Sequence, residues 1–173
     1  MTKSREMVLI GGTVKLLRER HSWAGETHIQ KTAFVSKVLK GVPFESEFVL
    51  YKHGPFSFEM STSLVHMRTR GLLSISQNPG YGPSFDVNEP LWKALDRTAS
   101  QYFEQYEADL AAVCDVLATK NVAWLERVAT ATYLNSLRPN ASVEERTNEL
   151  VQLKPHIPYA LARDAFDEVA SIS

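Results

Sequence analysis

The sequence predicts a mainly helical α+β protein with a winged helix-turn-helix core and an all-helical C-terminal extension. Two helical patterns are followed by a third that stops at Gly71. This third helix runs directly into two β-prone segments separated by a turn-rich loop, which is the order of a recognition helix and its wing. From residue 90 onward only helical patterns follow, without a low-complexity linker. We therefore expect a winged-helix-like domain over residues 1–88 and, packed on it in one compact unit, a helical extension over 89–173.

The composition is that of a globular protein. Of the 173 residues, 44% are hydrophobic and 23% are charged, so the chain is long enough to bury a core without disulfides. The single cysteine, Cys114, excludes an intramolecular disulfide and a Cys-rich zinc site, and its apolar neighbours predict that it is buried. No stretch approaches the roughly 20 apolar residues of a membrane span, and the N-terminus lacks the apolar core of a signal peptide. We expect a cytoplasmic protein.

The net charge of −1 is unevenly distributed along the chain. Residues 1–86 carry 11 Lys/Arg and 7 Asp/Glu, a net charge of +4, and residues 87–173 carry 8 Lys/Arg and 13 Asp/Glu, a net charge of −5. A basic N-terminal half weakly favours contact with phosphates or with an acidic partner. The bias is too small for a dedicated nucleic-acid-binding arm.

The first two helices are predicted from apolar periodicity. The first, over residues 5–20, contains the pair Gly11-Gly12, and because glycine costs about 1 kcal/mol against alanine inside a helix, the pair indicates close packing or a bend. After a break at residues 23–25, the second helix begins with Thr27 as its expected N-cap and ends at Gly41. Its polar face is expected to carry three lysines: Lys31, Lys37 and Lys40.

The next segment should lead into the candidate recognition helix. Residues 44–51 alternate well enough to predict a short strand, and Gly54-Pro55 predicts a turn. Ser57 is a good N-cap for the third helix. The wing is then expected from two strands, over residues 72–76 and 85–87.

The second half is expected to be helical throughout. A long aromatic-rich helix is predicted over residues 90–119, and it is a reasonable face for homodimerisation. Asn121 opens the next helix, Ser142 and Glu145 form a capping box for a short one, and a last helix covers residues 159–170. Large aromatic side chains should anchor the core: Phe34, Trp92 and Trp124.

Two groups of motifs resemble a known family. The first group is the run over residues 48–59, which contains Tyr51-Lys52-His53-Gly54-Pro55-Phe56-Ser57, followed by Leu64 and residues 70–73. The second group consists of Leu125-Glu126-Arg127-Val128-Ala129-Thr130-Ala131, Glu149-Leu150 and Lys154-Pro155-His156. Together they resemble the uncharacterised YwgA-like proteins, which look related to the Panacea, or SocA-like, antitoxin domain.

The resemblance covers most of residues 5–170, and its specific motifs cover about a quarter of that length. It departs in the second helix, where the family's usual Leu-Gln-Lys-Leu is replaced by His28-Ile29-Gln30-Lys31-Thr32-Ala33. The resemblance implies a winged-helix-containing fold, a prokaryotic or phage setting and, loosely, toxin neutralisation or regulation.

The densest set of functional side chains lies at the predicted turn before the third helix, at Tyr51, Lys52, His53, Gly54, Pro55 and Ser57. As a binding surface, this turn offers Lys52 and His53 to a partner protein, a phosphate or a carboxylate. As a structural turn, it needs a glycine for an unusual backbone angle, a proline at the helix start and a serine cap. Both interpretations can hold, because helix N-termini attract anions.

A second candidate surface is the recognition helix with its wing. The candidate nucleic-acid-binding residues are Ser61, Arg68, Arg70 and Tyr81. DNA readers usually place their base-contacting residues in the N-terminal half of this helix, where Glu59 would repel phosphate. A protein-binding winged helix is therefore at least as well supported by the sequence.

No motif in the sequence indicates catalysis or a cofactor. The five histidines are scattered without metal-ligand spacing, and the chain has no nucleophile elbow, phosphate loop or Gly-rich dinucleotide turn. We expect no metal, no cofactor and no enzymatic activity, although a phosphorylated substrate at Lys52 and His53 remains an alternative. The sequence favours a non-enzymatic interaction protein of antitoxin or accessory-regulator type. Its partner would be a toxin or a neighbouring gene product, and the alternative is a DNA-binding regulator.

Overall fold

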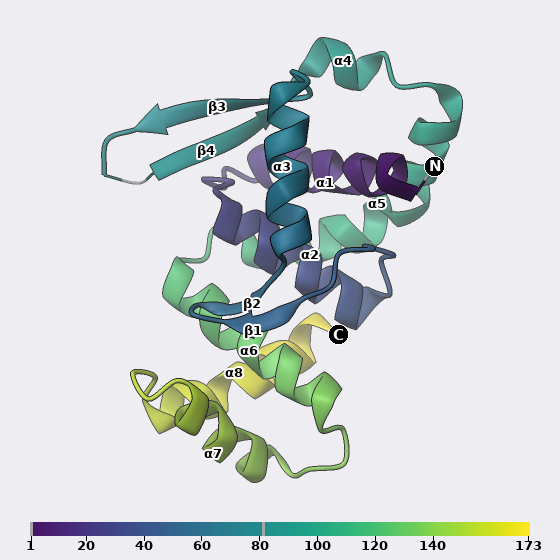
Figure 1. The fold of residues 1–173 in the computed structure, drawn as a ribbon. Coiled ribbons are helices and arrows are strands. Elements are labelled where there is room, and N and C mark those ends of the chain that lie inside the picture. The colour runs from purple at the N-terminus through teal and green to yellow at the C-terminus, as the bar shows by residue number, and fades with distance from the viewer. Residues whose placement is uncertain (1, 81) are drawn as a thin grey trace.

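The computed structural model describes residues 2–80 and 82–173, and this part of the chain contains eight helices and two antiparallel hairpins (Figure 1). The expected mainly helical α+β class is confirmed. No helix among the described residues is long and apolar enough to cross a membrane. In chain order the elements are α1 (Thr2–Glu19), α2 (Glu26–Lys40), β1 (Val49–Tyr51), β2 (Gly54–Phe56), α3 (Phe58–Thr69), β3 (Leu73–Asn78), β4 (Gly82–Val87), α4 (Glu89–Lys93), α5 (Arg97–Leu117), α6 (Val122–Leu137), α7 (Val143–Leu153) and α8 (Tyr159–Ile172).

The apolar interior consists of two clusters that share α2 and α5. The first joins α1, α2, α3, the β3–β4 hairpin and α5, and the second surrounds α6 together with α2, α5, α7 and α8. Phe103 and Leu110, from the second half of the chain, lie in the first cluster. The expected burial of Cys114 is confirmed, since its side chain is fully enclosed. Phe34 and Trp124 are buried as expected, whereas Trp92 is only partly buried.

The glycine pair of α1 allows aromatic rings of neighbouring helices to pack closely in the first cluster. α1 continues through both glycines without interruption. A Cβ added to Gly11 would lie 2.8 Å from the Trp92 ring, and one added to Gly12 would lie 2.0 Å from the Phe103 ring. Of the two explanations that the sequence left open, close packing is therefore confirmed.

The central helix, α2, differs from the sequence-based expectation in two ways. Its N-cap is Gly25, which provides no side-chain hydrogen bond, so the prediction of Thr27 as the cap was wrong. Every residue from His28 to Ser36 is buried, including Lys31, because other elements cover this helix on all sides. The prediction of an exposed lysine face therefore fails at Lys31. The predicted end at Gly41, which adopts φ +68°, is confirmed.

The segment before α3 also differs from expectation. The strand predicted over residues 44–51 is only three residues long, because Phe44 is buried in the first cluster on an extended segment that pairs with no strand. Gly54 and Pro55 belong to strand β2, so the turn lies at Lys52 and His53 instead. Ser57 caps α3 as predicted, since its Oγ accepts a hydrogen bond from the Met60 backbone N–H at 3.2 Å.

The β3–β4 hairpin follows α3 as predicted and extends away from the helices (Figure 1). The long helix predicted over residues 90–119 is in fact two helices, α4 and α5. Asp96 separates them, because its carboxylate caps α5 by accepting the Ala99 backbone N–H at 2.8 Å. The expected caps of the later helices, Asn121 and the Ser142/Glu145 box, are confirmed.

The packing of α1 predicts that a substitution that usually stabilises a helix will destabilise this protein. Gly12→Ala would normally stabilise a helix by about 1 kcal/mol. Here the new methyl group would overlap the buried Phe103 ring, and overpacking of this kind costs about 1–3 kcal/mol. We expect the free energy of unfolding, measured by urea denaturation, to fall. Unfolding at a higher urea midpoint than the parent would contradict the packing.

Candidate functional site

The residues singled out at the predicted turn form the β1–β2 hairpin, which packs against α2 and α6 (Figure 1). Gly54 adopts φ +86°, a conformation that L side chains rarely adopt. A Cβ at this position would also lie 3.0 Å from Thr130 Oγ1 and 3.4 Å from the Glu126 carbonyl oxygen. Glycine is therefore required here by both backbone geometry and space, which supports a structural role for this part of the motif.

A buried carboxylate lies directly behind the hairpin. Glu126 of α6 is 6% exposed, and three cationic or titratable side chains surround it. Its Oε1 forms an ion pair with Lys154 Nζ at 3.4 Å and accepts no hydrogen bond within the described residues. Its Oε2 lies 3.3 Å from His156 Nε2 and 3.8 Å from His53 Nδ1. We call Glu126, Lys154, His53 and His156 the Glu126 cluster.

Lys154 connects this cluster to the hairpin turn. Its ammonium group donates hydrogen bonds to the backbone carbonyl of Tyr51, at 2.8 Å, and to that of Lys52. The Lys154 side chain is 7% exposed. The loop between α7 and α8 is therefore attached to the turn between β1 and β2. The three sequence runs around residues 51–57, 125–131 and 154–156 thus meet at one place in the fold.

A second buried lysine reaches the same hairpin from α2. Lys31 is 2% exposed, and its Nζ donates a hydrogen bond to the Pro55 carbonyl oxygen at 2.7 Å. Burial lowers the pKa of Lys31 to about 8, because the ammonium ion is removed from water. The Glu126 carboxylate opposes this shift, whereas the nearby charge of Lys154 adds to it.

Sequence reasoning did not identify Lys31, Glu126 and Lys154 as site residues. Helical periodicity placed Lys31 on a polar face, and Glu126 and Lys154 were noted only as parts of the resemblance. The sequence held one signal for two of these residues: Glu126 and Lys154 lie in the motif runs that carry the family resemblance. Among the described residues, no group of three or more His, Cys, Asp or Glu side chains is arranged to hold a metal ion.

The candidate nucleic-acid-binding residues are not gathered on one surface. Ser61 lies in the first turns of α3, whereas Arg68 and Arg70 are exposed at its C-terminal end, beside the β3–β4 hairpin. Tyr81 lies outside the described residues. At the N-terminal end, Glu59 is exposed and its carboxylate accepts the Glu47 backbone N–H at 2.9 Å. Positive charge is therefore concentrated at one end of this helix.

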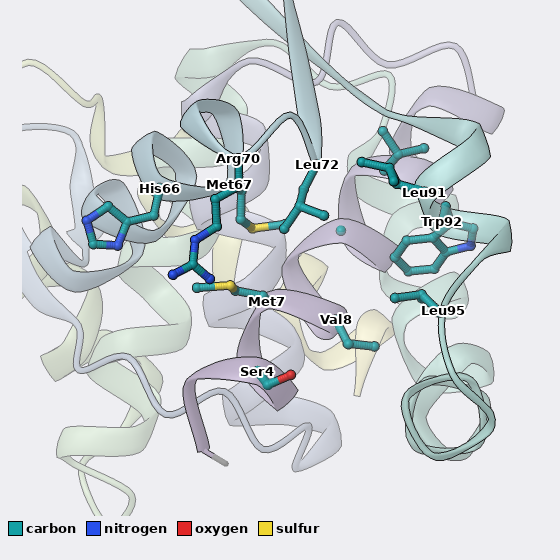
Figure 2. A pocket seen from close by; sticks show the side chains of 12 residues that line it. Ser4, Met7, Val8, His66, Met67, Arg70, Leu72, Leu91, Trp92 and Leu95 are labelled. Carbon is teal, nitrogen blue, oxygen red and sulfur yellow. The ribbon is translucent and has the colours of Figure 1, made fainter.

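An apolar groove lies at that same end, between α1, α3 and α4 (Figure 2). It has a volume of about 440 Å³. Its lining is mostly apolar, with Met7, Val8, Gly11, Met67, Leu72, Val87, Leu91, Trp92 and Leu95. The polar groups are Ser4, His66 and Arg70, and Figure 2 shows the Arg70 side chain extending from α3 toward α1. The sequence did not predict this groove, because α4 was merged with α5 into one long helix.

Comparisons of the chain with protein-family models, with curated proteins and with solved structures find no match. The interpretation of the two surfaces therefore rests on their geometry and charge.

The Glu126 cluster predicts a large and specific effect on stability. Lys154→Met would leave the buried Glu126 carboxylate without its lysine and two hairpin carbonyls without their donor. Removing one partner of a buried pair costs about 3–5 kcal/mol. We expect a loss of this size in urea unfolding, and a partial recovery when Glu126→Leu is added, because no unpaired carboxylate then remains.

The matched control is the more solvent-accessible pair Arg163–Asp167 of α8, whose side chains are 41% and 71% exposed and whose N–O distance is 2.8 Å. Exposed pairs contribute roughly 0–1 kcal/mol. Arg163→Met should therefore change the unfolding free energy very little. Equal losses for Lys154→Met and Arg163→Met would contradict a structural role for the buried pair.

Proposed function

We propose that this chain is a non-enzymatic interaction protein that binds a partner protein in the groove between α1, α3 and α4. The observation that carries the proposal is a mostly apolar groove with a cationic end, which no described segment of the chain covers. The occupant that suits it is an amphipathic helix of the partner, with apolar side chains on one face and a carboxylate beside them.

The lining supports a peptide occupant. Met7 and Met67 have flexible, polarisable side chains that adapt to different apolar surfaces. Leu91 is 42% exposed at the rim, so apolar surface continues from the groove to the outside. Grooves of this kind bind helices through apolar anchors one turn apart.

Charge supports an acidic flank on the partner. Arg70 lines the groove, and Arg68 lies exposed nearby on the same helix. Neither guanidinium forms an ion pair within the described part of the chain. A carboxylate on the partner would steer association and fix the register of binding.

The arrangement of α1, α2 and α3 before the β3–β4 hairpin supports a winged-helix interpretation of the first half. Within that interpretation, a partner-binding role agrees with the antitoxin-like or accessory-regulator type implied by the resemblance. The partner would be a protein such as a toxin or the product of a neighbouring gene.

The groove can be tested with one charge substitution and a matched control. Leu91→Glu places a carboxylate at the apolar rim, whereas Leu161→Glu places one on α8, where the leucine is equally exposed at 41%. In a pull-down from the native cells with nuclease present, we expect a specific partner to be retained by the parent and by Leu161→Glu. We expect Leu91→Glu to lose it, because an acidic partner segment would then meet a buried negative charge. Retention by Leu91→Glu at the parent level would refute the proposal.

DNA binding is the second candidate, supported by the exposure of Arg68 and Arg70 at the end of α3 that adjoins the hairpin. Arg68 does not line the groove, so Arg68→Glu tests this function with the groove unchanged. A DNA-binding α3 predicts salt-dependent affinity for duplex DNA that drops on this substitution. Affinity that is absent, or unaffected by Arg68→Glu, removes this candidate.

A further inference from the structure

A small polar cavity lies between the first turns of α2 and the turn of the β1–β2 hairpin. Its volume is about 190 Å³, which is ample for several waters and smaller than a typical drug-sized site. Its lining residues are Glu26, Thr27, Lys31, Tyr51, Lys52, His53, Gly54 and Phe56. The N-terminal end of α3 follows the β1–β2 hairpin (Figure 1), whereas the apolar groove is lined by residues at the C-terminal end of that helix. The two sites can therefore be tested separately.

Lys31 provides the main positive charge of this cavity. Its side chain is 98% buried, since only 2% is exposed, yet its ammonium has three donors and the Pro55 carbonyl accepts one of them. No carboxylate among the described residues lies within 4.0 Å of its Nζ. The neighbouring carboxylate, Glu126, pairs with Lys154 at 3.4 Å and acts on Lys31 only from a longer distance. The buried charge of Lys31 is thus left without a close counter-ion.

The hairpin turn supplies one further ammonium group and an imidazole. Lys52 and His53 line the same cavity and are exposed at its mouth. Lys154 holds the turn that carries both side chains, because its ammonium group donates hydrogen bonds to the Tyr51 and Lys52 carbonyls. The backbone of this turn is therefore held near Lys31 before any ligand arrives, which lowers the entropy cost of binding.

One acidic side chain lines this cavity, and a second, Glu126, lies behind it with its Oε2 3.8 Å from His53 Nδ1. Glu26 is the single carboxylate in the lining, and its Oε1 accepts a hydrogen bond from Gln30 Nε2 at 3.3 Å. Two lysines and an imidazole face this one carboxylate, so the lining has a net positive charge when Lys31 is protonated. The pKa of Lys31, about 8, keeps most of this amine charged at neutral pH.

We propose that this cavity binds a phosphate group, held by Lys31 from within and by Lys52 and His53 at the mouth. A compact oxyanion with several acceptor oxygens satisfies the free donors of Lys31 and supplies its missing counter-charge. The ligand class is free phosphate or a small phosphorylated molecule, because a cavity of about 190 Å³ is smaller than a typical drug-sized site.

The test is a titration of the ¹⁵N-labelled full chain with inorganic phosphate at pH 7, against chloride at equal ionic strength. We expect saturable shifts of the Thr27, His53 and Gly54 backbone amides with phosphate and none with chloride. We expect Lys52→Ala to weaken phosphate binding about tenfold, because a charge-assisted contact contributes about 1.4 kcal/mol. Lys40→Ala, at the far end of α2, should leave the affinity unchanged.

A second substitution addresses the buried amine. Lys31→Met should abolish saturable binding while the spectrum elsewhere stays that of the folded protein. If Lys31→Met does not fold, the Lys52→Ala titration still decides. Shifts that fail to saturate, that occur away from the cavity, or that persist unchanged in Lys52→Ala would overturn the site. A parallel titration with glycerol phosphate separates the two sources: tighter binding than inorganic phosphate assigns a phosphorylated molecule, and equal or weaker binding assigns free phosphate.

Discussion

The position of the β1–β2 hairpin depends on the burial of one carboxylate, Glu126. Burying a charged carboxylate costs free energy unless cationic groups pair with it. Here Lys154, in the loop after α7, forms an ion pair with Glu126. The same ammonium holds the carbonyls of Tyr51 and Lys52, while Lys31 holds that of Pro55 from α2. Elements from three parts of the chain are thereby fixed at one hairpin. Because Ser57 caps α3 immediately after that hairpin, this network also fixes where the candidate partner-binding helix begins.

The other end of α3 packs against α1, where Met67 Cε would lie 3.6 Å from a Cβ at Gly11. Gly11 and Gly12 remove two side chains from the α1 surface, so that the rings of Trp92 and Phe103 approach its backbone. Trp92 then forms part of the groove wall together with Met67 of α3. The groove is thus a consequence of the glycine pair and of the break between α4 and α5. Hydrogen bonds and an ion pair hold the N-terminal end of α3, and apolar packing holds its C-terminal end. The cavity near the first end is therefore polar, and the groove at the second end is apolar.

Helices and caps with a local signal could be predicted from the sequence. Ser57, Asn121 and the Ser142/Glu145 box each act through neighbouring backbone groups, and Gly41 ends α2 by a left-handed conformation. Features that depend on distant residues could not be predicted. Lys31 is buried because α2 is enclosed on every side, and Glu126, Lys154 and His53 meet only in the folded chain. The groove was missed because the Asp96 cap was not recognised inside an otherwise continuous helical pattern.

In the proposed function, a partner protein occupies the groove of α1, α3 and α4. Hydrogen–deuterium exchange of the chain, alone and in complex with the captured partner, tests this occupancy. We expect new protection over the segments 4–11, 66–72 and 87–95, which contain the groove lining, with the β1–β2 hairpin unchanged. Protection confined to the exposed face of α3 and the β3–β4 hairpin, with the groove segments exchanging as in the free chain, would contradict it.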